Sequence, residues 1–234
     1  MIKNIFYDLD GTLLPMDYDL FIKSYFGNLV KKLIPYGYDG EKLTSAVWAG
    51  TKAMVMNNGE RTNEEVFWEC FTKLIDIDMS KKYIFDDYYA NEFDKVKEVC
   101  GFNEKVPKLI STIKEMGLNQ VLATNPLFPE VATRKRVSWA GLSVDDFMTY
   151  TTYENSHYCK PNPKYYEEIL STLSLKPEET LMIGNDAEED VAAQKAGIKV
   201  FLVTDCLLNP KNLDISDVPK GDFDDALDYI KSLV

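Results

Sequence analysis

The sequence has few of the residues that build disulfide frameworks or zinc sites. It contains one histidine, His157, and four scattered cysteines with no pair at CxxC spacing (Cys70, Cys100, Cys159 and Cys206). This usage excludes a disulfide scaffold and a cysteine–histidine zinc site. It is typical of reduced thiols in a cytoplasmic protein, so we expect a cytoplasmic location.

Long apolar runs are also missing. No segment approaches the ~18 consecutive apolar residues of a membrane-spanning helix, so we expect no membrane association. The first residues, Met1 to Ile5, lead directly into a strand-like run and show no apolar signal-peptide core, which agrees with a cytoplasmic protein.

Positive charge is scarce. Lysine and arginine number 26 against 38 aspartate and glutamate residues, which gives a formal net charge of −12. A nucleic-acid partner requires a basic face, so this balance argues against one. An anionic substrate would need positive charge supplied locally, within the ~8 Å over which charges act at physiological salt.

The 234 residues suffice for one large domain, or for one domain with a smaller insert. From Glu104 onward, apolar runs alternate with helical patterns, which predicts βαβ units and a parallel sheet with right-handed crossovers. We expect strands over residues 5–7, 121–123, 147–150, 181–183 and 200–203.

The segment between the first strand and the others has a helical pattern. Asp17 is a suitable cap for a helix that buries the apolar positions 21, 25, 29 and 33, and a second helix is expected from about Glu41 toward Met56. Thr62 and Glu65 form a capping-box pattern ahead of a third helix.

These patterns predict an α/β fold, a doubly wound parallel sheet with an inserted all-helical cap. The core would consist of residues 1–14 and 97–234, and the cap of residues 15–96. Ligands of such sheets bind at the carboxyl ends of the strands, and an insert that leaves from that end would cover the crevice.

The most informative motif is Asp8-Leu9-Asp10-Gly11-Thr12, directly after the first apolar run. Gly11 permits a sharp turn. Neighbouring carboxylates repel each other, and a bound cation or a shared proton relieves that repulsion. A polar turn or a calcium loop are alternatives, although a calcium loop requires glycine at its sixth position, where this chain has Leu13. Phosphoryl transfer uses such a pair as nucleophile and acid/base.

Polar residues follow later strands as well. Thr124 and Asn125 come after one strand, Lys160 lies in a loop beyond the next, and Asp186 with Asp190 follow a third. Each has an ordinary alternative: a strand-end turn, a solvated loop lysine, and carboxylates that cap a helix.

Taken in order, these sites resemble the four motifs of the haloacid dehalogenase-like (HAD) hydrolase superfamily, and the insert resembles the helical cap of its subclass I (C1-type). The matching residues are Asp8-Leu9-Asp10-Gly11-Thr12, Thr124-Asn125, Lys160-Pro161, and Gly184-Asn185-Asp186 with Asp190.

The resemblance implies roles for these residues. Asp8 would attack phosphorus and form an aspartyl-phosphate, and Asp10 would act as general acid and then general base. Thr124, Lys160 and the backbone N–H of Asn125 would hold the phosphoryl oxygens.

The resemblance also implies a magnesium site. Mg²⁺ would bind the Asp8 carboxylate, the Asp10 backbone carbonyl and Asp186, because it prefers oxygen ligands. Asn185 stands where many relatives place the first metal-binding aspartate, so the resemblance implies that Asp186 would take that role if the loop accommodates the shift.

Three supporting roles follow from the same motifs. Asp190 would hold Lys160 in place, and Gly11 and Thr12 would shape the first motif. Lys160 and the cation would supply the positive charge that the composition lacks.

The function expected from this resemblance is a Mg²⁺-dependent phosphatase that hydrolyses a small phosphorylated metabolite or nucleotide. Asp10 favours phosphoryl transfer over dehalogenation, which does not need a second aspartate. A phosphomutase, a phosphonatase and a non-enzymatic phospho-acceptor remain alternatives. The identity of the substrate and the oligomeric state stay open at this level.

Overall fold

The computed structural model describes residues 1–75 and 79–234. Its centre is a five-stranded parallel sheet in the order β2-β1-β3-β4-β5. The strands are Asn4–Tyr7 (β1), Asn119–Leu122 (β2), Thr180–Gly184 (β3), Lys199–Val203 (β4) and Lys220–Gly221 (β5). This confirms the predicted doubly wound α/β fold. The chain reverses its strand order at β1 and β3, which is where such sheets bind ligands.

Alternate residues of each strand face opposite sides of the sheet, as the period of two requires. Tyr7 and Ile183 belong to the larger core cluster, whereas Phe6 and Met182 belong to a second cluster beneath α7. Both faces are therefore buried, which explains why the strands read as continuous apolar runs rather than as alternating ones.

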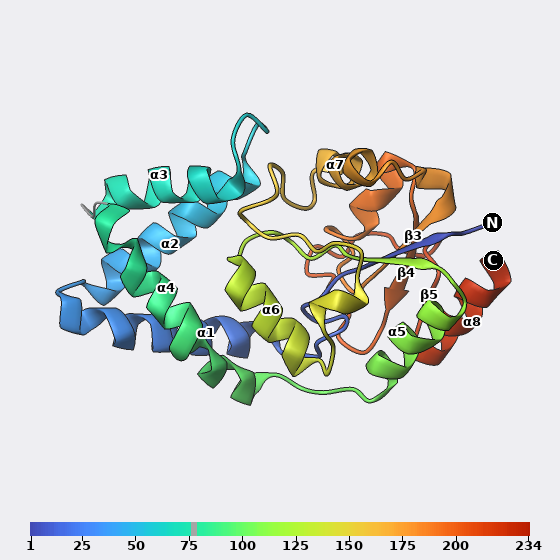
Figure 1. Cartoon of the computed structure of the whole chain (residues 1–234), viewed down its shortest axis with the longest axis horizontal. Coiled ribbons are helices and arrows are strands. Elements are labelled where there is room, and N and C mark those ends of the chain that lie inside the picture. The colour runs from blue at the N-terminus through green and yellow to red at the C-terminus, as the bar shows by residue number, and fades with distance from the viewer. Residues whose placement is uncertain (76–78) are drawn as a thin grey trace.

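Helices cover both faces of this sheet, and Figure 1 shows α5 and α8 on one side and α7 on the other. The α-helices of the core are Lys105–Glu115 (α5), Glu130–Trp139 (α6), Pro163–Leu173 (α7) and Phe223–Leu233 (α8). Short 3₁₀ helices lie at Val144–Asp146, Pro177–Glu179 and Val191–Ala196. The two chain ends meet beside the sheet, where the Ile2 amide donates to the Leu233 carbonyl (2.8 Å).

The segment after β1 is helical, and Figure 1 shows α1 to α4 grouped away from the sheet. Its helices are Tyr18–Leu33 (α1), Gly40–Val55 (α2), Asn63–Ile75 (α3) and Lys82–Asn91 (α4), with 3₁₀ turns at Ile34–Tyr36, Met79–Lys81 and Phe93–Val99. The boundaries at residues 14/15 and 96/97 stay a prediction.

The predicted helix starts are confirmed. The Asp17 side chain accepts a hydrogen bond from the Leu20 amide, and α1 buries the four predicted apolar positions, 21, 25, 29 and 33. Thr62 and Glu65 form the predicted capping box, in which the Thr62 amide donates to the Glu65 carboxylate (2.9 Å).

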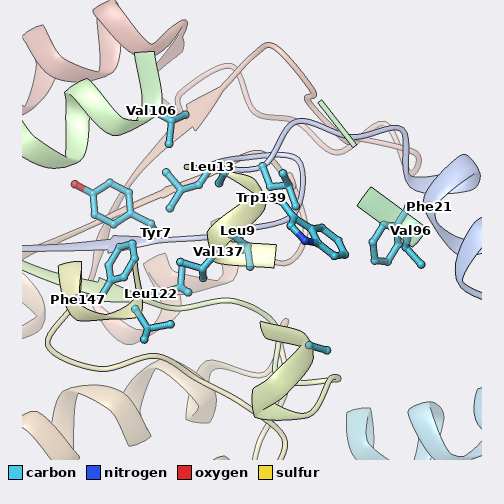
Figure 2. Packing of buried hydrophobic residues seen from close by; sticks show 14 of the residues in the cluster. Tyr7, Leu9, Leu13, Phe21, Val96, Val106, Leu122, Val137, Trp139 and Phe147 are labelled. Atoms are coloured by element: carbon cyan, nitrogen blue, oxygen red, sulfur yellow. The ribbon is translucent and has the colours of Figure 1, made fainter. Parts of the chain in front are cut away.

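The interior of the first cluster joins the sheet to the helical segment. Figure 2 shows Tyr7, Leu122 and Phe147 near the sheet, and Phe21 with Val96 at the far end, with Trp139 of α6 between them. A continuous apolar interior of this kind fixes α1 and α6 relative to the strand ends.

One predicted strand is wrong. Residues 147–150 run beside β2 and form a single isolated bridge, Leu122 with Tyr150. The Met148 amide donates to the Gln120 carbonyl (2.8 Å), but Met148 is more than half exposed. The apolar run therefore lies at the edge of the sheet without forming a full ladder. The two-residue strand β5 went unpredicted because Lys220 and Gly221 carry no apolar signal.

Within residues 1–75 and 79–234, no helix combines the length and apolar character that crossing a bilayer requires.

Candidate active site

The carboxyl ends of β1, β2 and β3 meet at a crevice of about 1030 Å³. Its lining includes the polar residues Asp8, Asp10, Thr124, Asn125, Asp186, Glu189 and Asp190. Six of these seven were predicted as site residues from the sequence, and the fold brings them together because parallel strands end at one edge of the sheet. We call this cavity the active-site crevice.

A buried lysine connects two of the predicted carboxylates. The Lys160 ammonium lies 2.8 Å from Asp8 Oδ1 and 2.7 Å from Asp190 Oδ1, and Lys160 is 1% exposed. Burial opposes its charged form, yet the two carboxylates hold the pKa of Lys160 well above its ordinary value. The predicted solvated-loop alternative is therefore excluded, and Lys160 stays protonated.

Asp8 is held in a buried position between this lysine and Thr12. Burial raises the pKa of Asp8, while Lys160 opposes the increase. The carboxylate is thus poorly hydrated and paired with one cation, which suits a nucleophile.

Asp190 is fixed by backbone groups as well as by Lys160. Its Oδ2 accepts hydrogen bonds from the amides of Asn185 and Asp186, both at 2.9 Å. A side chain at position 184 would collide with the Asp190 carboxylate, so glycine is required there. Asp190 is therefore held next to Lys160 by the backbone, and its role in orienting Lys160 stays a prediction.

Asp10 has a partner that the sequence did not reveal. Arg136 of α6 is fully buried and donates to Asp10 Oδ2, and its guanidinium lies 4.5 Å from the centre of the Phe128 ring. Asp10 Oδ1 is buried with no hydrogen-bond partner among the described residues. Burial raises the pKa of Asp10, and Arg136 opposes the increase.

A sequence signal for Arg136 existed. It lies four residues after Ala132 and three before Trp139, both of which are buried on the same helix. A charged residue at a helical core position indicates a buried ion pair.

Asn125 and Thr124 hold the end of β2 in place. The Thr124 carbonyl accepts hydrogen bonds from the hydroxyls of Tyr165 (2.8 Å) and Thr151 (2.6 Å). The Asn125 side chain accepts from the Lys160 amide (3.2 Å) and donates to Glu189 (2.9 Å). Asn125 therefore ties three motifs together through its side chain, a contact that the sequence did not predict.

Asn185 links the first and last motifs. Its Oδ1 accepts from the Thr12 hydroxyl (2.9 Å) and its Nδ2 donates to the Cys206 carbonyl (2.8 Å). Gly11 has a φ of +84°, and a Cβ there would collide with the Asn185 amide. The predicted glycine turn therefore also makes room for this amide.

Asp186 and Glu189 form the acidic side of the crevice. Asp186 Oδ1 accepts from the amides of Glu188 (2.7 Å) and Glu189 (2.8 Å), so the capping role considered from the sequence is present. Burial raises the pKa of Glu189 to about 8, with a smaller opposing effect from Lys160. Glu189 was not predicted as a site residue.

The donor set fits a magnesium ion. Asp8, Asp10 and Asp186 line one crevice, and two of them are paired with a buried cation, Asp8 with Lys160 and Asp10 with Arg136. The described residues contain no cluster of three or more His, Cys, Asp or Glu side chains arranged around a metal position. The ligand set predicted from the sequence, two carboxylates and one backbone carbonyl, would be smaller than such a cluster, and Mg²⁺ tolerates a small protein ligand set because it retains several waters.

Three basic side chains lie outside the crevice. His157 Nδ1 lies 2.6 Å from Glu168, Arg61 pairs with Glu69, and Arg134 contacts the Tyr150 hydroxyl (3.1 Å). These side chains have local partners and do not line the crevice.

A known protein family matches most of this chain. A family model described as haloacid dehalogenase-like hydrolase matches residues 5–203, which include all four motifs. The pyrophosphatase PpaX of Anoxybacillus flavithermus is 25% identical over 199 residues, covering 85% of this chain and 81% of that protein. The pyrophosphatase PpaX of Bacillus thuringiensis is 25% identical over 205 residues, covering 87% and 83%.

Solved structures share the fold. A predicted phosphoglycolate phosphatase from Haemophilus somnus 129pt has a TM-score of 0.60 and 18% identity, with 98% of each chain covered. The L-2-haloacid dehalogenase of Xanthobacter autotrophicus has a TM-score of 0.52 and 16% identity, covering 90% of this chain and 80% of that one.

Proposed function

We propose a reaction for this protein from the premise that the chain belongs to the haloacid dehalogenase-like hydrolase family and is an enzyme of it. It hydrolyses phosphoric monoesters of small molecules through an aspartyl-phosphate. The observation that carries the proposal is the buried chain Asp8–Lys160–Asp190 beside a second carboxylate, Asp10. Relatives named pyrophosphatase support phosphoryl transfer rather than dehalogenation.

The first step forms a bond between Asp8 and phosphorus as the bond from phosphorus to the leaving oxygen breaks. Asp10 donates its proton to that oxygen, so the product leaves as a neutral alcohol. Burial raises the pKa of Asp10, which favours the protonated form that this step needs.

The second step releases phosphate. A water molecule attacks the phosphorus of the aspartyl-phosphate, and Asp10, now ionised, accepts a proton from that water. The Asp8 carboxylate is regenerated, and Asp10 is protonated again.

Charge on the phosphoryl oxygens requires nearby donors. Lys160 contributes a positive charge next to Asp8, and Thr124 with Asn125 line the same crevice. Preorganised donors of this kind stabilise the charge that develops in the transition state.

Magnesium completes the proposed site. Asp8, the Asp10 backbone carbonyl and Asp186 would hold it, and when bound it supplies charge neutralisation for the phosphoryl oxygens. We also propose that residues 15–96 act as a cap over a core of residues 1–14 and 97–234. Tyr18, Phe21 and Ile22 of α1 line the crevice, which supports this division.

The test is phosphate release from a panel of phosphate esters and pyrophosphate, with and without Mg²⁺. We expect Mg²⁺-dependent release, abolished in Asp8→Asn and lowered by about 10²-fold or more in Asp10→Asn. Asp228→Asn is the matched control, because its side chain is 79% exposed on α8.

Two outcomes would contradict the proposal. Full activity in a folded Asp8→Asn protein would exclude Asp8 as the nucleophile. Conversion of a sugar phosphate into its isomer, with little release of phosphate, would identify a phosphomutase instead.

A further inference from the structure

Part of the active-site crevice is apolar. Tyr18 and Ile22 of α1 and Leu127 and Phe128, from the loop before α6, line it; we call these four residues the apolar wall. The same four residues also line a second, smaller cavity of about 60 Å³ among the helices α1 to α4. The two cavities therefore adjoin at the apolar wall.

The smaller cavity, which we call the aromatic pocket, presents ring surfaces. Its further lining includes Phe26, Trp48 and Phe67. Some of its polar ring atoms are paired with one another: the hydroxyls of Tyr25 and Tyr89 lie 2.8 Å apart, and Trp68 Nε1 donates to the Tyr153 hydroxyl (3.4 Å). The lining that remains is suited to apolar contact and offers few partners for a polar ligand.

Two rings at these cavities are incompletely buried. Tyr18 is 48% exposed and Trp48 is 44% exposed, although both line the aromatic pocket. Each ring therefore offers exposed apolar surface next to a cavity, where the aromatic group of a ligand would find a stacking partner.

Positive charge is missing from both cavities. Among the described residues that line them there is no lysine, arginine or histidine. The cations close to these linings already have carboxylate partners. Lys160 is bonded to Asp8 and Asp190, Arg136 beside Phe128 is paired with Asp10, and Lys82 near the Trp68 ring is paired with Asp86. A second anionic group on the substrate would therefore face carboxylates, and the described lining offers it no unpaired cation.

We propose that the group released from phosphate is an uncharged alcohol carrying an aromatic ring, which lies on the apolar wall and points toward the aromatic pocket. The inference rests on the proposed phosphatase function and names its substrate class. The crevice, at about 1030 Å³, has room for such an ester. Pyrophosphate and phosphorylated acids are then poor substrates, in contrast to the names of the relatives.

The test compares kcat/KM for four compounds at saturating Mg²⁺: 2-phenylethyl phosphate, ethyl phosphate, 2-phosphoglycolate and pyrophosphate. The first two esters release alcohols of similar reactivity and differ in the ring. We expect 2-phenylethyl phosphate to exceed ethyl phosphate by about tenfold or more, the discrimination that an apolar pocket typically provides. We expect the two anionic compounds to be slower still.

A variant pair tests the location of the ring. Trp48→Ala should lower the ratio between the two esters several-fold, whereas Tyr83→Ala should leave it unchanged. Tyr83 is a 61% exposed aromatic residue of α4 outside both cavities. Thermal unfolding of both variants checks that the fold is retained, and the substrate ratios of the unmodified protein test the inference without any variant.

The outcomes separate the inference from the proposed function. Equal rates for the two esters, or faster hydrolysis of pyrophosphate or phosphoglycolate, would overturn the aromatic assignment while leaving the phosphatase in place. A Trp48→Ala variant that behaves like Tyr83→Ala would also overturn it. No phosphate release from any compound would contradict the phosphatase function itself.

Discussion

Arg136 and Glu189 show how individual residues set the chemistry of the crevice. Arg136 is a fully buried cation paired with Asp10. Glu189 is an acidic residue that accepts a hydrogen bond from the Asn125 side chain. A buried charge persists only with a partner, because desolvation without one costs several kcal/mol. Each of these residues therefore depends on the fold around it, and each leads to a prediction.

Replacing Arg136 should impair the acid/base residue. In Arg136→Met the Asp10 carboxylate loses its cation and its orientation, so we expect kcat to fall by about 10²-fold with a smaller change in KM. The same change should lower the free energy of unfolding by about 3 kcal/mol, because a buried ion pair is broken.

Arg136→Lys is the matched control, since it keeps the charge but loses the planar fork. It should recover part of the lost kcat. Steady-state kinetics and urea unfolding of both variants measure these effects. Unchanged kcat in Arg136→Met would show that Arg136 does not orient Asp10.

Glu189 should make stability depend on pH. Burial raises its pKa from the ordinary 4.5 to about 8, so the folded protein binds more protons than the unfolded chain between these values. The free energy of unfolding should therefore decrease as pH rises through this window, and the contribution is lost above pH 8.

Glu189→Gln removes this titration. Compared with the unmodified protein, it should show a smaller loss of stability between pH 5 and pH 9, by on the order of 1–3 kcal/mol. Urea unfolding at several pH values in the absence of Mg²⁺ measures the difference. Parallel stability curves for the two proteins would contradict the prediction.

At the scale of elements, helix α3 supplies the Phe67 and Trp68 rings that line the aromatic pocket. It begins at the Thr62–Glu65 capping box, in which each residue accepts a hydrogen bond from the other's backbone amide. The start of α3 is thus fixed by local sequence, and the positions of its rings follow from that start.

Loss of this cap should weaken the helix. Thr62→Ala is expected to lower the free energy of unfolding by about 1 kcal/mol, because amides at the helix start lose a partner. Thr62→Ser keeps the hydroxyl and should change stability much less. Denaturant unfolding of the two variants compares them, and equal values would show that the cap contributes nothing.

The strand expected over residues 147–150 shows the limit of reading elements from local pattern. The run is apolar and shares backbone hydrogen bonds with β2, such as that from the Leu122 amide to the Thr149 carbonyl (3.0 Å), yet Met148 is exposed and only one residue pair forms a bridge. Whether an apolar run becomes a strand depends on how far it stays in register with its neighbour, and periodicity does not report that register.

At the scale of the whole molecule, the net charge of −12 opposes the approach of a phosphate ester. Repulsion between like charges lowers the association rate, and salt screens it over ~8 Å at physiological ionic strength. The local cations act after the substrate arrives, so the surface charge governs the encounter.

Increasing salt should therefore help this enzyme. Between about 10 mM and 150 mM KCl, at constant free Mg²⁺, we expect kcat/KM to rise about two- to fivefold, mainly through a lower KM. An uncharged osmolyte at equal osmotic strength is the control. A decrease with salt would indicate that attraction, not repulsion, governs the encounter.

The sequence by itself determined the parallel α/β fold, the helical insert and the identity of the motif residues, because each depends on local pattern. Alternating apolar runs specify strands and helices, and polar residues at strand ends must meet at one edge of a parallel sheet. The family match over residues 5–203 confirms the resemblance drawn from those motifs.

Tertiary structure decided which partners these residues have. Arg136 reaches Asp10 across 126 positions of the chain, and the Asn125 side chain reaches Lys160 and Glu189 from another loop. It also placed rings from four helices around one pocket whose described lining holds no lysine, arginine or histidine. Such contacts arise from packing between distant segments, where burial selects the pairings, and no local spacing in the sequence encodes them.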